Sequence, residues 1–344
     1  MPSLKLGNNN VTTVKIGSTQ VNKVYLGATE IWSSFVPSDP NAATYINTMN
    51  ALPGVTLSTT EQQAIDELFI RMKGNDPLYS NFGDAGIWNA TKAFYPYLGS
   101  NLEAYRYNAM FPVAATQSTD SGGYPNSPGY QYIAGGVTID GIYGAKGNGV
   151  NGVILTNLNW ISGHASSLSV TSLCMGAVYK TTSATGRDDF GDYNPFVNES
   201  GIWLRTKPNP ANARLSCLEG SGITGDYVVG GKGHWMLHRT GNDKRVYYQG
   251  NLLNYPPGQN RTVEGSPSFG GIFTWTFLGL NFAAFNYYNG IQYTDSATRA
   301  ARCVNFSDNT LMAAYIMDGF SNTLIPAWNQ MIEDFCVKTG KKTW

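Results

Sequence analysis

The sequence is short of charge and of long apolar runs. Charged residues make up 13% of its 344 residues, and 23 basic side chains balance 23 acidic ones. Such a balance, without a cluster of Lys and Arg, gives no electrostatic attraction to a nucleic-acid backbone or an anionic membrane. No stretch of about 18 apolar residues is present, and the N-terminus shows no basic segment followed by an apolar one. We therefore expect no nucleic-acid partner, no membrane insertion and no ordinary secretion.

Cysteine is scarce as well. Cys174, Cys217, Cys303 and Cys336 stand far apart, and none of them forms the C-x-x-C pair of a zinc or redox site. Cys174 and Cys217 fall inside apolar, strand-like runs, which favours buried free thiols in a protein that folds in a reducing cytosol. A single disulfide between Cys303 and Cys336 is the alternative.

Patterns of the common catalytic sites are missing too. Of three histidines, only His234 and His238 lie close together. On a strand this spacing separates them by roughly 13 Å, so we expect a place in a sheet rather than a metal site. No G-x-S-x-G elbow occurs, and no strand has the E-x-D-x-E pattern that would supply a catalytic carboxylate pair. These absences predict that the chain is not an enzyme.

Glycine and aromatic residues are abundant instead. The chain has 39 Gly, 21 Tyr and 8 Trp, a composition that favours β-sheet with many turns. Between about residues 110 and 320, short apolar runs alternate with Gly, Asn, Asp, Ser and Pro, which predicts an antiparallel sandwich. The clearest hairpin pattern is GHWMLHRTGNDKRVYYQGNLLN at 233–254, where the residue types alternate on both sides of a Gly-Asn-Asp turn.

The first 33 residues contain a ten-residue repeat. It reads LKLGNNNVTT, VKIGSTQVNK and VYLGATEIWS, and each unit predicts a strand of about six residues followed by a turn that begins at glycine. The apolar residues alternate and form one face that so short a segment cannot bury by itself. The candidate contact residues are Val14, Ile16, Val24, Leu26, Ile31 and Trp32. We interpret 1–35 as an anchoring or oligomerisation segment; the alternative is an ordinary meander of the main domain.

Helical patterns follow the repeat. Asp39 is a candidate N-cap for one helix, and Ser58 with Glu61 forms a capping box before a second. A third, short helix is predicted over 86–95. Together these pieces make residues 36–105 a small helical unit.

The C-terminal segment has one more helical pattern. Leu324, Trp328, Met331 and Phe335 recur at the spacing of one helix face, and Gly340 is the predicted stop. The basic run KTGKK at 338–342 is interpreted as a solvated tail.

One acidic segment is a candidate binding site. The run RDDFGDYNPF at 187–196 places Asp188, Asp189 and Asp192 beside Tyr193. This combination could form a rim loop that binds calcium or sugar, and a solvated turn is the alternative. No other metal and no organic cofactor is expected.

Two sets of these motifs resemble known families. The hairpin at 233–254 resembles the central hairpin of laminin-G-like and concanavalin A-like lectin sandwiches. The order of motifs along the chain is similar to a family of tailed-bacteriophage virion proteins. These motifs are DPNAATYINTMNALPGVTLSTTEQQAIDELFIRMK (39–73), IWNATKAFYPYLGS (87–100), GAKGNGVNGVILTN (144–157) and NTLIPAWNQMIEDFCVKTGK (322–341). The N-terminal repeat also resembles the openings of phage fibre proteins.

The resemblance implies a mainly β fold, a concanavalin-like jelly roll over 106–344 that includes the C-terminal helix. It also implies a structural component of a tailed-phage particle, a fibre or decoration protein that exposes a lectin-like domain to host-surface glycans. The implied partners are capsid or tail proteins and further copies of the chain, most simply in a trimer. The implied location is the virion, assembled in the host cytoplasm. The alternatives are a phage glycan depolymerase on the same scaffold and a cellular carbohydrate-binding module.

Overall fold

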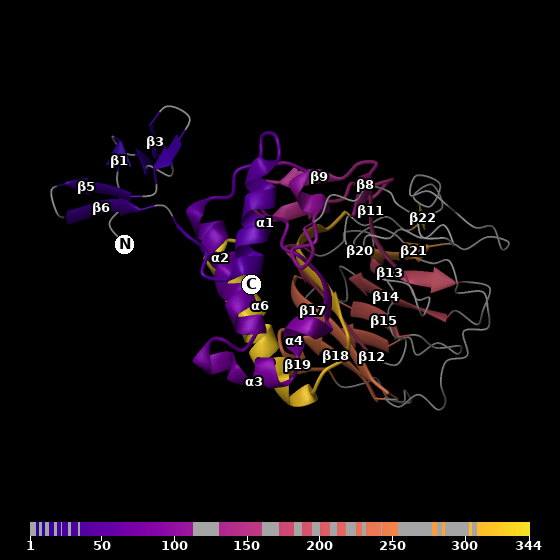
Figure 1. The fold of residues 1–344 in the computed structure, drawn as a ribbon. Helices are drawn as coiled ribbons and strands as arrows, with labels where there is room; N and C mark the ends of the chain where they lie inside the picture. The colour runs from indigo at the N-terminus through magenta and orange to yellow at the C-terminus, as the bar shows by residue number, and fades with distance from the viewer. Residues whose placement is uncertain are drawn as a thin grey trace, which may run out of the picture.

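The computed structural model describes residues 35–112, 131–159, 172–181, 232–241, 243–253 and 308–344, together with the short strands of 5–33 and 188–304 that are named below. Strands dominate, and all of their pairings are antiparallel (Figure 1).

The larger sheet has eight strands. Its order is β19-β18-β17-β12-β23-β10-β9, and β7 lies beside β10 on the same edge of β23. The expected hairpin at 233–254 is confirmed, because β17 and β18 pair with Leu237 opposite Val246. The strands are β7 (Thr91–Tyr95), β9 (Thr138–Asp140), β10 (Gly144–Lys146), β12 (Ser172–Tyr179), β17 (Gly233–Thr240), β18 (Asp243–Tyr248), β19 (Asn251–Leu252) and β23 (Thr310–Met317).

The second sheet has seven strands in the order β16-β15-β14-β13-β20-β11-β8. Ile133 and Ile154 pair between β8 and β11, and both belong to the hydrophobic core that the two sheets share. The strands are β8 (Tyr132–Ala134), β11 (Val153–Asn159), β13 (Asp188–Asn194), β14 (Ser200–Thr206), β15 (Asn212–Cys217), β16 (Gly225–Val228) and β20 (Phe277–Leu280). A separate two-stranded sheet joins β21 (Ala284–Phe285) to β22 (Cys303–Val304).

Each ten-residue repeat corresponds to one hairpin rather than to one strand and a turn. The pairs are β1 (Lys5–Leu6) with β2 (Asn9–Asn10), β3 (Val14–Ile16) with β4 (Thr19–Val21), and β5 (Lys23–Leu26) with β6 (Thr29–Ser33). In every pair, two residues that begin with glycine connect the strands, which is the hairpin connection with the strongest local preference. The period was therefore predicted correctly, and the number of strands per period was not.

The predicted helix starts are confirmed. Helix α1 (Pro40–Ala51) begins after Asp39, whose carboxylate accepts from the backbone N–H groups of Asn41 and Ala42. Helix α2 (Thr59–Met72) has the predicted capping box of Ser58 and Glu61. Helix α6 (Ile325–Lys338) closes the chain. The shorter helices are η1 (Pro77–Tyr79), α3 (Ser80–Asp84), α4 (Ile87–Ala90), η2 (Ala104–Arg106) and η4 (Asn322–Leu324).

The predicted helix over 86–95 is corrected. Only Ile87–Ala90 is helical, and Thr91–Tyr95 forms β7, with Ala93 opposite Ile316 and Phe94 opposite Tyr315. Local spacing places Phe94 on a helix face with Ile87, but pairing with the central strand of the sheet overrides that preference.

The elements form layers (Figure 1). Helices α1, α2 and α6 lie on one side of the eight-stranded sheet, and the seven-stranded sheet lies on its other side. The architecture is therefore mainly antiparallel β-sheet with some helices, consistent with a β-sandwich. Residues 36–105 do not pack as an isolated unit, because their helices and β7 belong to the same core as the sheets.

Candidate functional site

The predicted ligand residues lie on a strand. Asp188, Asp189, Asp192 and Tyr193 belong to β13, which pairs with β14 on one side and β20 on the other. The expected rim loop or turn at this position is therefore wrong. Asp192 pairs with Ile202 and Tyr193 with Gly201, so these two positions lie on opposite faces of the sheet. A ligand-binding role for the four residues stays a prediction.

The N-terminal hairpins repeat their register as well as their sequence. The pairs that flank the connections are Leu6 with Asn9, Ile16 with Thr19 and Leu26 with Thr29. Val14 pairs with Val21 and lies on the face of Ile16, and Val24 pairs with Trp32 and lies on the face of Leu26. A register shift in the third hairpin leaves Ile31 without a directly opposite residue. Ile16 is 76% exposed, the second most exposed large apolar side chain of the described residues after Leu78. The hairpins thus present equivalent positions at intervals of ten residues.

The chain becomes fixed to the core directly after the repeats. Phe35 packs against the core, the Ser38 hydroxyl donates to the Asp66 carboxylate at 2.8 Å, and the Asp39 backbone N–H donates to it at 2.8 Å. Lys73 Nζ lies 2.6 Å from the Asp39 carboxylate. Asp66 is buried on α2, and through these two hydrogen bonds it holds the start of α1 against α2. No local pattern predicts this role, since Asp66 stands on the helix as an ordinary acidic residue.

His234 on β17 faces helix α6, and both of its ring nitrogens form hydrogen bonds. Its Nδ1 is 2.7 Å from Asn329 Oδ1, and its Nε2 is 2.8 Å from the Tyr315 hydroxyl. Because an amide oxygen only accepts, Nδ1 donates to Asn329 and Nε2 accepts from Tyr315. Burial lowers the pKa of His234 to about 4. A neutral ring with both nitrogens occupied cannot act as a base or a metal ligand without breaking this network.

His238 occupies the same face of β17. Its Nε2 accepts from the Phe320 backbone N–H at 3.1 Å, and its ring meets the Phe320 ring edge to face. Burial lowers the pKa of His238 to about 4. Both histidines therefore have the sheet-face place that the strand pattern predicted, and both anchor the segments packed on that face.

Lys341 corrects the expectation of a solvated tail at 338–342. Its side chain is buried, and its Nζ donates to the backbone carbonyls of Pro96 and Tyr97 at 2.7 Å each and of Met312 at 2.9 Å. Burial lowers the pKa of Lys341 to about 7. The ammonium joins the C-terminal segment to the end of β7 and to β23. A basic run in a sequence does not reveal such a cage, because the three carbonyls come from two distant segments.

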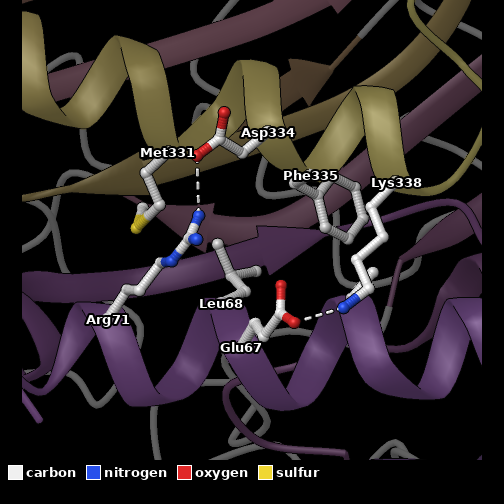
Figure 2. A pocket seen from close by; sticks show the side chains of 8 residues that line it. Glu67, Leu68, Arg71, Met331, Asp334, Phe335 and Lys338 are labelled. Atoms are coloured by element: carbon white, nitrogen blue, oxygen red, sulfur yellow. Dashed lines mark hydrogen bonds and ion pairs between the residues drawn. The ribbon is translucent and has the colours of Figure 1, made fainter. Parts of the chain in front are cut away.

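A small surface pocket lies between α2 and α6 (Figure 2). Leu68, Met331 and Phe335 form its apolar part, with Ala64 also in the lining. Arg71 lies 2.8 Å from Asp334, and Lys338 pairs with Glu67 across the two helices. Since these four charges balance and pair with each other, the pocket is a seam between packed helices with no free charged group to hold a ligand.

Two of the four cysteine side chains lie in the described part of the structure. Cys174 and Cys336 are free and buried, so the alternative disulfide between Cys303 and Cys336 is not formed. Burial raises the pKa of Cys336 to about 12. The side chains of Cys217 and Cys303 lie outside the described part of the structure. Within the described part, no group of three or more His, Cys, Asp or Glu is placed to hold a metal ion.

None of the helices in the described ranges is long and apolar enough to cross a membrane.

Comparisons with known proteins give structural neighbours only. No family model and no curated protein sequence matches the chain. Trypanosoma rangeli sialidase superposes with 13% identity and a TM-score of 0.41 over 60% of this chain and 30% of that chain. A mutant of that sialidase displaying trans-sialidase activity superposes with 13% identity and a TM-score of 0.44 over 80% of this chain and 39% of that chain. The Ruminococcus gnavus IT-sialidase CBM40 superposes with 13% identity and a TM-score of 0.30 over 47% of this chain and 84% of that chain.

The superpositions cover only part of the two sialidase chains. The chain spans 30% to 39% of the length of the two sialidase chains, and at TM-scores below 0.5 the likeness assigns no function. It does contradict the prediction that the chain is not an enzyme, because the sialidases are enzymes. That prediction depended on missing local motifs, whereas the fold can bring catalytic groups together from distant segments. We therefore withdraw it.

Proposed function

We propose that the chain is an attachment protein of a tailed-phage particle. The N-terminal hairpins join it to capsid or tail proteins, and a concanavalin-like, laminin-G-like jelly-roll domain binds glycans of the host surface. The virion setting and the lectin-like family come from the motif order at 39–73, 87–100, 144–157 and 322–341 and from the hairpin at 233–254.

The observation that carries this proposal is that the N-terminal hairpins contribute no described residue to the hydrophobic core, unlike the helices and the two sheets. None of the described residues before Phe35 belongs to the common core, whereas helices and both sheets contribute to it. An isolated two-stranded hairpin is at best marginally stable in water. Three such hairpins with equivalent registers and an exposed Ile16 therefore need a surface to pack on.

Self-association is the second part of the proposal. A repeated apolar strip can close its edges by packing copies around an axis, and a trimer is the arrangement that the fibre resemblance suggests. The same strip would also serve docking on a different virion protein. The anchoring role requires only that the strip be covered in the particle.

Deleting residues 1–34 tests the anchor. The shortened protein keeps Phe35 on the core, so we expect it to remain folded and soluble, with an unchanged thermal unfolding midpoint, but to be absent from assembled particles. Immunodetection on purified particles is the measurement. Incorporation of the shortened protein at the normal level would overturn the anchoring role.

A pair of point variants refines the same test. Ile16→Asp places a charge on the apolar strip, while Gln20→Asp places one on the opposite face of the same hairpin, since Gln20 pairs with Lys15. We expect only Ile16→Asp to lower incorporation and to shift the mass measured by light scattering toward the monomer. If unmodified protein is monomeric at micromolar concentration, self-association is wrong and docking on another protein accounts for the strip.

A further inference from the structure

Two asparagines join the connections between the sheets. The chain passes from the seven-stranded to the eight-stranded sheet through residues 135–137, between β8 and β9, and returns through residues 147–152, between β10 and β11. Asn151 Oδ1 accepts from the Gly136 backbone N–H at 3.1 Å and from Asn148 Nδ2 at 2.9 Å. These three residues form an asparagine clasp, in which Asn151 joins the two connections and Asn148 holds Asn151 in place.

The side-chain carbonyl of Asn148 lies among backbone donors. Its Oδ1 accepts from the N–H groups of Val150 and Asn151 at 3.0 Å each and from that of Gly152 at 3.1 Å. Three such donors polarise the carbonyl and stabilise negative charge that develops on its oxygen, as the donors of an oxyanion hole do. Asn148 Cγ is therefore activated toward a nucleophile.

The nucleophile is the next backbone nitrogen. Gly149 follows Asn148, and attack of its nitrogen on Asn148 Cγ closes a succinimide ring, with no Cβ on Gly149 to obstruct the approach. No described residue accepts a hydrogen bond from the Gly149 N–H. Asn148 is exposed and Gly149 is half-buried, so hydroxide from solvent can reach this group.

Asn151 has the same local sequence in a different environment. Both asparagines occur as N-G-V, at 148–150 and 151–153. The nitrogen that would attack Asn151 is that of Gly152, which is buried and donates to Asn148 Oδ1. Asn151 Oδ1 accepts from a single described backbone N–H, that of Gly136. The fold therefore favours ring closure at Asn148 over Asn151.

We infer that Asn148 is a site of spontaneous modification, in which loss of its side-chain amide opens the asparagine clasp. Gly149 N loses its proton to hydroxide and bonds to Cγ, the carbonyl re-forms from the oxyanion, and the Cγ–Nδ2 bond breaks. Nδ2 takes a proton from water and leaves as ammonia. Water then adds to either ring carbonyl and opens the succinimide to aspartate or isoaspartate. The net change consumes one water and releases one ammonia.

The product lacks the donor that the clasp requires. An aspartate at this position still accepts from the three backbone N–H groups, but it has no N–H for Asn151 Oδ1. Its second oxygen would face that acceptor, which is unfavourable. The connections between the sheets are then held less tightly, and the chain gains one negative charge. This modification is independent of the attachment role.

Peptide mapping by mass spectrometry tests the site. The full chain is incubated in heavy-oxygen water at mildly alkaline pH, both folded and in urea, and label uptake is measured at Asn148 and Asn151. In the folded protein we expect Asn148 to convert at least about tenfold faster than Asn151, whereas in urea the two rates should agree within about twofold. Equal rates in the folded protein, or slower conversion of Asn148 there than in urea, would overturn the inference.

Hydrogen exchange tests the opening of the clasp. Asn148→Asp has the product side chain and should speed exchange of the Gly136 N–H about fivefold. Asn101→Asp is the matched control, because Asn101 Oδ1 also accepts from a backbone N–H, that of Glu103, in another loop. It should leave exchange at Gly136 unchanged, and circular dichroism should show that both variants are folded. Unchanged exchange at Gly136 in folded Asn148→Asp would show that loss of the amide does not open the clasp.

Discussion

The two sheets of the sandwich differ in the residue patterns of their strands. In the eight-stranded sheet, β12 and β23 are buried at nearly every position, because helices pack on one face and the second sheet on the other. In the seven-stranded sheet, apolar and polar residues alternate: Ile202 and Leu204 lie on one face, and Trp203 and Arg205 on the other. An alternating pattern is typical of a strand with one face on the core, and an uninterrupted apolar run is typical of a strand covered on both faces.

The buried histidines of the eight-stranded sheet show what this covering does to polar side chains. His234 forms hydrogen bonds with Asn329 and Tyr315, and His238 accepts from the Phe320 backbone N–H. Both rings are therefore structural elements that join the sheet to the segments packed on it. In the seven-stranded sheet, the charged residues Arg205 and Arg214 occupy directly opposite positions on neighbouring strands.

The strongest test exchanges a buried tryptophan that packs on the eight-stranded sheet for alanine. Trp328 on α6 is fully buried, and its ring lies 5.0 Å from Tyr315 and 5.9 Å from Phe320. Trp328→Ala leaves a cavity and should lower the free energy of unfolding by about 3–5 kcal/mol. Urea unfolding measures the loss, and a cost below about 1 kcal/mol would contradict the burial of this ring.

A second test uses pH. The pKa values of His234 and His238 are lowered by burial to about 4, so both rings are neutral in the folded protein, while in the unfolded chain they take up protons near pH 6.5. The unfolded state therefore binds more protons between these values, and stability falls as the pH drops from about 6.5 to about 4.

At pH 5 the expected loss relative to pH 7 is roughly 2 kcal/mol for each ring. Urea unfolding at both pH values measures it, and His238→Gln should reduce the pH dependence by about half. A stability that does not change between pH 7 and pH 5 would contradict the buried, neutral state of these rings.

The smallest expected effect compares two neighbouring lysines. Lys341→Met removes the ammonium from three carbonyl groups and should lower the free energy of unfolding by about 2 kcal/mol. Lys342→Met removes a partly exposed ion pair with Glu333 and the contact of the ammonium with the Trp344 ring, and it should cost less than about 1 kcal/mol. The midpoints of urea unfolding distinguish the two. Equal costs would mean that Lys341 is not caged.

Local rules predicted the elements whose stabilising contacts lie close in the sequence. The caps at Asp39 and Ser58 are confirmed because a side chain that satisfies N–H groups two or three residues away needs no distant partner. The hairpin at 233–254 follows from alternation around a short turn. Residues 91–95 were predicted incorrectly because their strand exists only through pairing with residues 314–317, more than two hundred positions later.

The sequence by itself determined the ten-residue period, the helix starts and the strand alternation, because each depends on residues within about one turn or one hairpin of each other. Only the tertiary structure decided that Lys341 is buried, that β7 joins the sheet and that Asp188 is level with Arg205, Arg214 and Asp226. A short turn sets the register within a hairpin, but the register between strands from distant segments depends on packing of the whole sheet.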